Sequence, residues 1–170
     1  MEHGFLKDFT FERAHRADAD AIEALYCAVK AHGRESGGTD WNDEYPTRAF
    51  IDDDIENGAA FVLRHGGGIV AAVSMLEEDD LDDCGVAWTQ KRSCVIARLC
   101  VEPKLQGKHI GEHMMRLLSL EARREGYEAT RHLASAANPK SLRLYDRMGY
   151  KRLGMVRLYD IDFYAYEMLL

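Results

Sequence analysis

With 170 residues, of which 46% are hydrophobic, the chain is long enough to bury a core of its own, and we expect residues 1–170 to form one domain. The formal net charge of −7 leaves no basic stripe for a phosphate backbone, which argues against general nucleic-acid binding. The longest apolar run, residues 69–76, is too short to span a bilayer, so we expect no membrane partner.

The first half of the chain carries two helix signals among three strand signals. Asp18 is a candidate N-cap for apolar residues at helical spacing that continue to about His32, before a loop over residues 33–39. Thr47 is a candidate cap for a second helix, which an Asn57-Gly58 pair ends. The predicted strands are residues 9–13, 60–64 and 69–76, the last two joined by a glycine-rich hairpin turn.

A polar loop over residues 77–92 leads into the second half of the chain. There the apolar patterns predict a strand over 95–101, a helix over 109–125, a strand over 129–134, a helix over 139–148 and a closing antiparallel pair over 150–159 and 163–170. Asn138 and Pro139 give the last helix an N-cap and a proline at its first position. This order predicts an α/β fold, with a mixed sheet of about seven strands flanked by about four helices.

A strand, a glycine-rich turn and a helix follow one another directly between residues 95 and 124. The strand is apolar apart from Arg98 and ends at a Val101-Glu102-Pro103 sequence, and an amphipathic stretch begins at Glu112. Backbone amides exposed at such a turn, together with the positive end of the helix dipole, form a site for a phosphate or pyrophosphate. We therefore expect this turn to hold a phosphate-bearing ligand.

Two segments on these elements resemble the GNAT superfamily of acyl-CoA N-acyltransferases. The turn from Gln106 to Gly111 is similar to the family's acyl-CoA signature, which is Gln or Arg, any two residues, Gly, any residue, and Gly or Ala. His109 stands where the family usually has glycine, and its Cβ narrows the approach to the backbone amides. Asn138 is followed seven residues later by Tyr145 and then by a Gly149-Tyr150 pair, which also resembles the family. The resemblance implies a GNAT-like fold across nearly the whole chain.

The resemblance implies acetyl-CoA as co-substrate and no metal. It also implies that the amides of the turn cradle the pyrophosphate and that the end of the strand pairs with the pantetheine arm. The residues expected to contact acetyl-CoA are Leu99, Cys100, Val101, Gln106, Gly107, Lys108, His109, Ile110, Gly111, Asn138 and Tyr145. Asn138 has a second interpretation as a helix N-cap, and both roles are compatible.

Direct transfer to an amine needs a donor for the carbonyl oxygen, an acid for the departing thiolate and a base for the ammonium. The backbone N–H of Val101 is the candidate oxyanion donor, a contribution of roughly 3 kcal/mol. Tyr145 is the candidate general acid, because a neutral phenol that titrates near ~10 can donate a proton as the thiolate forms. Glu77, after the third predicted strand, is the candidate base, with ordered water as the alternative.

The expected acceptor is a primary amine, either on a small molecule or on a peptide. An amino acid, a polyamine, an aminoglycoside-like drug and a protein N-terminus all fit. Trp41, Tyr45 and Trp88 lie in predicted loops, where they either line an acceptor pocket or cap the core. The acidic run over residues 77–83 either engages a cationic acceptor or is a solvated loop. By resemblance, we also expect a homodimer through the aromatic C-terminal strands.

Other interpretations stay open. Residues 109–113 match H-x-x-E-H, a pattern of inverted zinc hydrolases, although the glycine inside the motif and the lack of a clear third ligand count against it. A non-catalytic regulatory domain that binds acyl-CoA would need the same turn. Cys100 lies in an apolar strand, where a thiol is normally inert. The four cysteines include no C-x-x-C pair, which indicates reduced thiols and a cytoplasmic location.

Overall fold

The computed structural model describes residues 8–37, 41–77 and 81–170. Its elements are β1 (Thr10–Arg13), α1 (Ala19–Ser36), α2 (Arg48–Glu56), β2 (Ala60–His65), β3 (Gly68–Leu76), β4 (Ser93–Val101), α3 (Ile110–Arg124), β5 (Ala129–Ser135), α4 (Pro139–Met148), β6 (Lys151–Leu158) and β7 (Ile161–Leu169). Short 3-10 turns cover Arg16–Asp18 and Pro103–Leu105. None of the helices in the described ranges is long and apolar enough to cross a membrane. The predicted order and the predicted α/β fold are confirmed.

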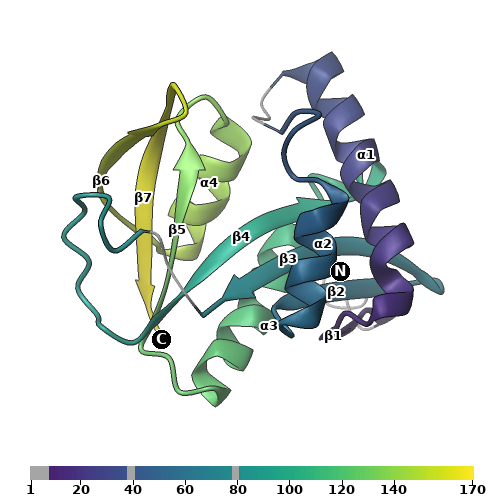
Figure 1. The fold of residues 1–170 in the computed structure, drawn as a ribbon, viewed down its shortest axis with the longest axis horizontal. Helices are drawn as coiled ribbons and strands as arrows, with labels where there is room; N and C mark the ends of the chain where they lie inside the picture. Colours follow the sequence, from purple (N-terminus) through teal and green to yellow (C-terminus); the bar gives the residue numbers. More distant parts are fainter. Residues whose placement is uncertain (1–7, 38–40, 78–80) are drawn as a thin grey trace.

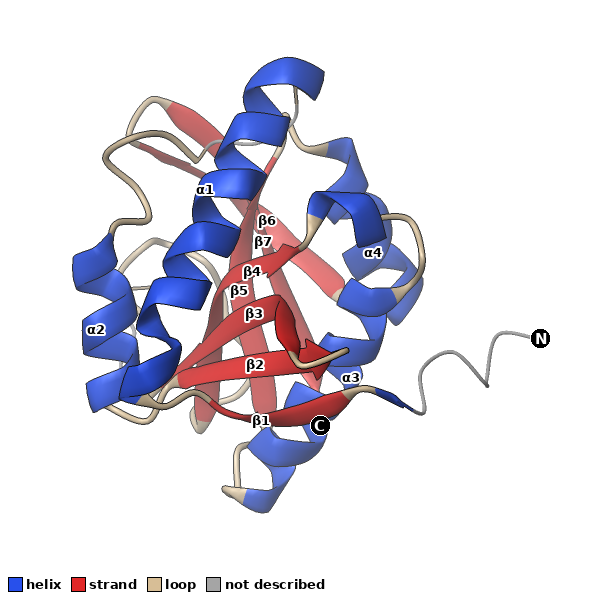
Figure 2. Ribbon diagram, turned by 90° about the vertical axis from the view of Figure 1, so that its right-hand side faces the viewer, coloured by secondary structure: helices blue, strands red, loops and turns tan. Residues whose placement is uncertain are grey.

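The strands form one seven-stranded sheet in the order β1-β2-β3-β4-β5-β7-β6. Neighbouring strands run antiparallel, except for β4 and β5, which pair in parallel. Figure 2 shows the sheet between two layers, with α1 and α2 on one side and α3 and α4 on the other. The sheet is therefore mixed, and its parallel pair lies at the centre.

Each layer of helices covers its own hydrophobic core. On one face, α3 and α4 pack against the sheet through a cluster that includes Ile110, Met114, Leu118 and Tyr145. On the other face, α1 and α2 pack through a second cluster, which includes Ile22, Leu25, Tyr26, Ile51 and Cys100. Since successive side chains of a strand point to opposite faces, the central strands contribute to both cores, and β4 is apolar on both faces apart from Arg98, as the sequence predicts.

The parallel pair at the centre of the sheet is short. The backbone register joins β4 and β5 only over Ser93–Val95 and Ala129–Arg131. Beyond these residues the two strands diverge toward their C-terminal ends, as Figure 1 shows for the arrowheads of β4 and β5. The register between β3 and β4 shifts three residues further along β4, where Val73 alone faces both Arg98 and Leu99. Such a β-bulge bends a strand, and this one lies within the stretch over which β4 diverges from β5.

The predicted N-caps of α1 and α2 lie at the right positions but act differently. Asp18 and Thr47 directly precede α1 and α2, yet neither side chain accepts a hydrogen bond from its helix. The Asp18 carboxylate instead accepts from the backbone N–H of His15 at 2.8 Å and from Arg64 of β2 at 2.7 Å. Asp18 therefore fixes the approach to α1 and ties it to the sheet.

The first helix is longer than predicted. It passes His32 and Gly33 and ends at Ser36, so the prediction of a loop from residue 33 is wrong for its first residues. Gly37, with φ of 67°, ends the helix by donating its backbone N–H to the carbonyl of Gly33 at 2.9 Å. A glycine inside a helix is tolerated at a cost of about 1 kcal/mol, whereas the left-handed position after the helix selects glycine.

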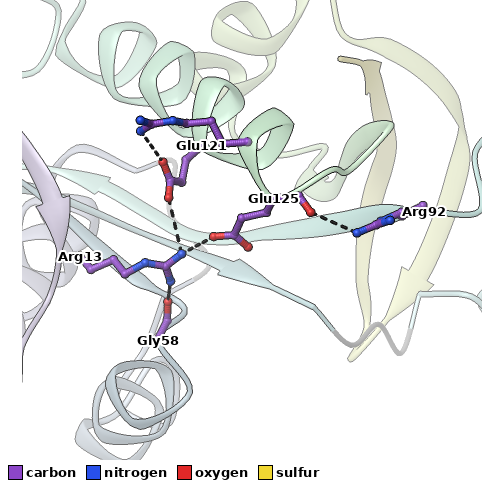
Figure 3. Close-up of polar contacts among 6 residues, drawn as sticks. Arg13, Gly58, Arg92, Glu121 and Glu125 are labelled. Atoms are coloured by element: carbon purple, nitrogen blue, oxygen red, sulfur yellow. Dashed lines mark hydrogen bonds and ion pairs between the residues drawn. The ribbon is translucent and has the colours of Figure 1, made fainter.

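A polar network that includes Arg13 of the edge strand β1 anchors the C-terminal turn of α3 (Figure 3). The Arg13 guanidinium on β1 contacts the carboxylates of Glu121 and Glu125, and it also donates to the carbonyl of Gly58. Arg92, just before β4, donates to the carbonyl of Glu125 at 3.1 Å. This end of α3 is therefore held to β1, to the turn after α2 and to the start of β4, which leaves its N-terminal turn at the opposite end of the sheet.

Candidate active site

The end of β4 offers backbone groups to the gap between β4 and β5. The N–H of Glu102 donates to the carbonyl of Val70 on β3 at 2.8 Å. Because backbone groups alternate sides along a strand, the N–H and carbonyl of Val101 point away from β3. The side-chain amide of Gln106 donates to that carbonyl at 3.2 Å, as this direction requires. The predicted oxyanion donor, the N–H of Val101, therefore faces the gap.

The turn between β4 and α3 is built on two left-handed residues. Gly107 has φ of 77°, and a Cβ at this position would meet nothing within 4 Å, so the space beside the turn is open. His109 has φ of 59° and is the N-cap of α3, so the helix begins one residue later than predicted. Histidine is among the residues that tolerate this conformation better than most. His109 thus keeps a backbone shape that glycine adopts freely, and the N-terminal amides of α3 stay directed out of the helix.

The first turn of α3 packs directly behind this turn. A Cβ added at Gly111 would lie 3.6 Å from Val101 and 3.6 Å from Leu144 of α4, both ordinary contacts. Gly111 therefore marks the place where β4, α3 and α4 approach one another. The sequence predicts this residue as part of the site, and the structure brings it to the strand end that carries the predicted oxyanion donor.

Glu112 connects the two helices that flank the gap. Its carboxylate lies 2.8 Å from Arg116 in the same helix, 2.9 Å from Arg147 of α4 and 3.4 Å from the Nδ1 of His109. The hydrogen bond from Arg116, with further bonds from Arg147 and His109, lowers the pKa of Glu112 to about 2. The ion pair with Arg147 fixes α4 against the N-terminal turn of α3. The same Glu112 carboxylate holds the ring of His109 in the glycine-rich turn.

Tyr145 lies in a cluster of aromatic rings on the α3–α4 face. Its ring centroid is 4.0 Å from that of His132 on β5, and Tyr150 and Tyr166 complete the cluster. Burial raises the pKa of Tyr145, so the phenol stays protonated at neutral pH. Burial also lowers the pKa of His132 to about 3, so its imidazole is neutral. Neither ring nitrogen of His132 has a hydrogen-bond partner in the described residues.

The three tyrosines of this cluster differ in their hydroxyl groups. The Tyr150 hydroxyl lies 2.8 Å from the hydroxyl of Thr130, and the Tyr166 hydroxyl donates to Asp146 at 3.1 Å. The Tyr145 hydroxyl makes no hydrogen bond within the part of the chain that the structure describes. The cluster thus anchors two phenols to the protein and keeps the third available to a ligand.

Asn138 acts as the predicted cap of α4. Its side-chain oxygen accepts a hydrogen bond from the backbone N–H of Ser141 at 3.2 Å, and Pro139 occupies the first position of the helix. Gly149, with φ of 89°, ends the helix. Local sequence therefore sets both ends of α4, and the helix carries Tyr145 on its buried side.

The predicted acceptor-side aromatic residues separate into different environments. Trp41 packs edge-on against Tyr26, with ring centroids 5.0 Å apart, and belongs to the α1–α2 core. Tyr45 is 36% exposed and contacts the ring of Phe50. The Tyr45 hydroxyl also lies 3.4 Å from Arg98 of β4. Trp41 thus covers the core, whereas Tyr45 stays accessible beside the bulged strand.

Trp88 belongs to a loop that closes over the sheet. Its ring lies 5.0 Å from the guanidinium of Arg131, which is buried on β5 and pairs with Asp82 at 2.7 Å. The next residue, Thr89, donates its backbone N–H at 3.0 Å to Glu167, which is buried on β7 directly opposite Arg131. The loop therefore docks on the face of β5 and β7 that points away from Tyr145.

Glu77 lies away from the other predicted catalytic groups. It directly follows Leu76, which pairs with Val95 near the start of β4. At about 3.3 Å per residue, the strand carries Val101 about 20 Å from Val95. The structure therefore does not bring the Glu77 carboxylate to the predicted oxyanion donor, and the other carboxylates of the predicted acidic run include residues 78–80, outside the described residues.

The alternatives based on metal and on cysteine chemistry gain no geometric support. His109 caps α3 from outside the helix in a left-handed conformation, whereas His113 lies within it. Among the described residues, no three His, Cys, Asp or Glu side chains lie together in a group that could hold a metal ion. Cys100 is buried, and this burial raises the pKa of its thiol to about 12. A thiol in this state is a poor nucleophile at neutral pH.

Sequence reasoning missed the charged side chains buried on the α1–α2 face. Asp54, Arg131 and Glu167 are each less than a tenth exposed, and Arg98 shares this burial through its ion pair with Asp54. Their partners lie far away in the sequence, so no local motif predicts their burial. Arg98 had one signal, since it is the single charged residue in the apolar run over residues 95–101.

The fold has counterparts among known proteins. A family model described as the acetyltransferase (GNAT) family matches residues 21–150. A GNAT-family acetyltransferase from Streptococcus agalactiae is similar in structure, with a TM-score of 0.82, 20% identity and 96% of each chain covered. No curated protein matches the sequence.

Two further structures extend the comparison. A putative acetyltransferase from Salmonella typhimurium, solved with its cofactor acetyl-CoA, has a TM-score of 0.72 and 20% identity, and the alignment covers 96% of this chain and 95% of that one. A polyamine N-acetyltransferase from Drosophila melanogaster has a TM-score of 0.73 and 18% identity, with 96% of this chain and 100% of that chain covered. The fold is shared at low identity, and the family match spans most of the sequence, so this chain belongs to the GNAT family of acetyltransferases.

Proposed function

We propose that residues 1–170 form one N-acetyltransferase domain that moves an acetyl group directly from acetyl-CoA to a primary amine. The observation that carries this proposal is the Tyr145 hydroxyl, the one phenol of its cluster without a protein partner among the described residues. Tyr145 lies on the helix that Glu112 ties to the glycine-rich turn. A proton donor and an anion site therefore flank the same gap.

The residues around the gap fit acetyl-CoA. The space beside Gly107 is open, and the N-terminal amides of α3 provide donors and a positive dipole end for the pyrophosphate. The Val101 backbone faces a gap in which β4 has no strand partner, which suits an arm that carries amide groups. Leu99 and Cys100 complete this stretch of strand. When bound, acetyl-CoA supplies the activated acetyl group as a thioester.

Two groups of the chain carry the proposed chemistry. The N–H of Val101 donates to the carbonyl oxygen, where negative charge develops during attack. Tyr145 holds its proton at neutral pH and delivers it to the departing sulfur. The same burial that raises the pKa of the phenol disfavours a free thiolate beside it, so the proton moves as the charge forms.

Ordered water is our preferred route for removing the proton of the ammonium. Of the two alternatives that the sequence offers, Glu77 lies near the start of β4, at the opposite end from Val101. A water relay needs no carboxylate at the strand end. Direct transfer without a covalent acyl-cysteine is favoured because the Cys100 thiol is buried and protonated.

We propose a small cationic amine as the acceptor. The chain has a formal net charge of −7, which favours cations near its surface. Among structures that share the fold, one is a polyamine N-acetyltransferase that forms N-acetylagmatine, and another is an agmatine N-acetyltransferase. The exposed ring of Tyr45, whose hydroxyl lies 3.4 Å from Arg98 at the bulge, is a candidate acceptor contact.

Calorimetric titration with acetyl-CoA tests the cofactor site. Gly111→Glu places a carboxylate between β4, α3 and α4 and is expected to abolish binding. Gly111→Ala adds only a Cβ in ordinary contact and is expected to bind as the wild type does. Equal binding by the Glu variant and the wild type would show that the pyrophosphate does not bind at this turn.

Turnover distinguishes the enzyme from a regulatory domain that binds acyl-CoA. Release of free thiol is measured with a panel of polyamines, amino acids and peptides. Amine-dependent release at a rate above hydrolysis supports the proposal. Tight binding of acetyl-CoA with no release from any amine in the panel would favour the regulatory alternative.

A further inference from the structure

Arg98 occupies a backbone conformation that non-glycine residues rarely adopt. Its φ is 55°, in the middle of β4, at the bulge where Val73 faces two residues of the neighbouring strand. An L-residue in the left-handed region is strained by contact between its Cβ and the backbone. Strain of this kind persists only where the surrounding structure over-determines it, and it concentrates at functional sites.

A buried ion pair holds the Arg98 side chain. Its guanidinium donates to both carboxylate oxygens of Asp54 on α2, at 2.5 Å and 2.7 Å. The Arg98 side chain is 6% exposed and the Asp54 side chain is 4% exposed. The hydroxyl of Ser74 on β3 donates to the same carboxylate at 2.5 Å. The ring of Phe50 lies 5.2 Å from the guanidinium. The groups around Arg98 therefore come from α2, from β3 and, through the Tyr45 hydroxyl at 3.4 Å, from the loop before α2.

The position of this ion pair matters for the proposed chemistry. The bulge lies between the last residue of β4 that pairs with β5, Val95, and the predicted oxyanion donor, Val101. A bulge changes the direction in which the following backbone groups point. The contact between Arg98 and Asp54 thus pulls β4 toward α2 at the level where the gap opens.

We propose that Arg98 is a positioning residue whose ion pair with Asp54 holds the bulge and thereby aims the N–H of Val101 into the gap. The proposal rests on the proposed acetyl transfer, for which that N–H is the oxyanion donor. The Arg98 side chain is 6% exposed, so we assign it no direct contact with the reacting groups. Its contribution passes through the backbone, and it is realised when charge develops on the acyl oxygen.

A pair of double variants separates this role from ordinary stabilisation. Asp54→Asn removes the charge and keeps the side-chain shape beside Ser74, so no unpaired carboxylate remains when Arg98 is replaced. In this background, Arg98→Gly and Arg98→Ala remove the same ion pair. They differ in one methyl group, and only glycine adopts the left-handed conformation freely.

The two double variants are compared for kcat, for KM and for acetyl-CoA binding by calorimetry. The glycine variant is expected to keep the higher kcat, with the alanine variant lower by about tenfold or more, as misplacement of a catalytic group produces. Acetyl-CoA affinity is expected to agree within about threefold, since both variants keep the turn that binds the pyrophosphate. Equal kcat values for the two variants, both as high as that of the wild type, would overturn the proposal.

Crystal structures and thermal unfolding of the same two variants provide a readout that does not depend on activity. The glycine variant is expected to retain φ near its present value at residue 98 and to melt at the higher temperature. The alanine variant is expected to lose the left-handed conformation. An unchanged bulge in both variants would overturn the proposal. Absence of transfer by the wild type would instead refute the proposed function, and the structural comparison would still decide whether the ion pair holds the bulge.

Discussion

The two faces of the sheet near the gap hold their buried polar groups by different chemistry. On the α3–α4 face, a neutral histidine and three tyrosines pack ring against ring, and His132 has no partner for either ring nitrogen in the described chain. On the α1–α2 face, Arg98 and Arg131 are each buried against a carboxylate. The buried polar groups of the α3–α4 face, here called the ring face, are uncharged. Those of the α1–α2 face, here called the charged face, form ion pairs that hold the backbone in place.

This difference suits the tasks proposed for each face. A general acid must hold its proton until the leaving group needs it, and burial among rings has this effect on Tyr145. A strained strand needs a strong, directional contact, which a bidentate guanidinium–carboxylate pair provides. Four changes test whether the two faces can be treated separately, and they follow in order of decreasing expected effect.

Replacing Tyr145 with Phe tests the ring face as a source of protons. We expect kcat to fall about 10²–10⁴-fold, as loss of a general acid does, with acetyl-CoA affinity unchanged because only the hydroxyl is removed. The matched control is Tyr150→Phe, which removes a phenol that already pairs with Thr130. Comparable losses of kcat in the two variants would show that the cluster acts as packing alone.

Replacing Asp54 with Ala tests the charged face as a structural device. Arg98 would remain buried without its partner, so we expect the free energy of unfolding to fall by about 3–5 kcal/mol in urea titrations. Asp53→Ala, one residue earlier in the same helix and exposed, is the control. A loss no larger than that of the control would mean that the buried pair carries no stability.

Replacing His132 with Phe is expected to increase stability. The change removes two buried nitrogens without partners and keeps a ring in the cluster, so the free energy of unfolding at pH 7 should rise by about 1–3 kcal/mol. Unfolded histidine titrates near 6.5, whereas burial lowers the folded pKa to about 3. The wild type should therefore lose stability relative to the variant as the pH falls below 6.5, because the unfolded state takes up the proton first. A variant less stable than the wild type, both at pH 7 and below pH 6.5, would contradict this prediction.

The smallest expected effect concerns Glu112, which joins the helices of the ring face. Its pKa is lowered from 4.5 to about 2, mainly by the hydrogen bond from Arg116, so its stabilising effect is present above pH 4.5 and is lost as the pH falls toward 2. Glu112→Gln should lower the free energy of unfolding by about 1 kcal/mol at pH 7, after solvent screening, and by less at pH 3. Urea titrations at the two pH values measure the difference, and a constant difference would argue against the ion pairs.

Local signals account for what could be read from the sequence on the ring face. The turn from Gln106 to Gly111 is contiguous, and the cap at Asn138 and the phenol of Tyr145 lie on one short helix. Turn, cap and periodicity therefore predict these elements without knowledge of the tertiary fold, and the resemblance to the GNAT family singles out Tyr145 on the last of them. His132 escaped notice because nothing in its strand pattern distinguishes a buried histidine from an exposed one.

The charged face depends on contacts between distant segments, and sequence reasoning missed it for that reason. Asp54 and Arg98 are separated by 44 residues and meet only because α2 packs across β3. Glu77 is the converse case. The acidic run after a strand predicts it as the base, whereas the antiparallel register places that end of β3 beside the start of β4. Register between strands, which no short motif encodes, decided both cases.

The short parallel pairing between β4 and β5 makes the sheet incomplete by itself. Only the first residues of the two strands join β1–β4 to β5–β7, so a long stretch of β4 backbone lacks a neighbour on one side. Under the proposed function, the pantetheine arm would take the place of a strand there and close the sheet. Loading with the co-substrate would then also be a step in assembling the protein. Its stability should rise with the logarithm of co-substrate concentration, even when no amine is present to react.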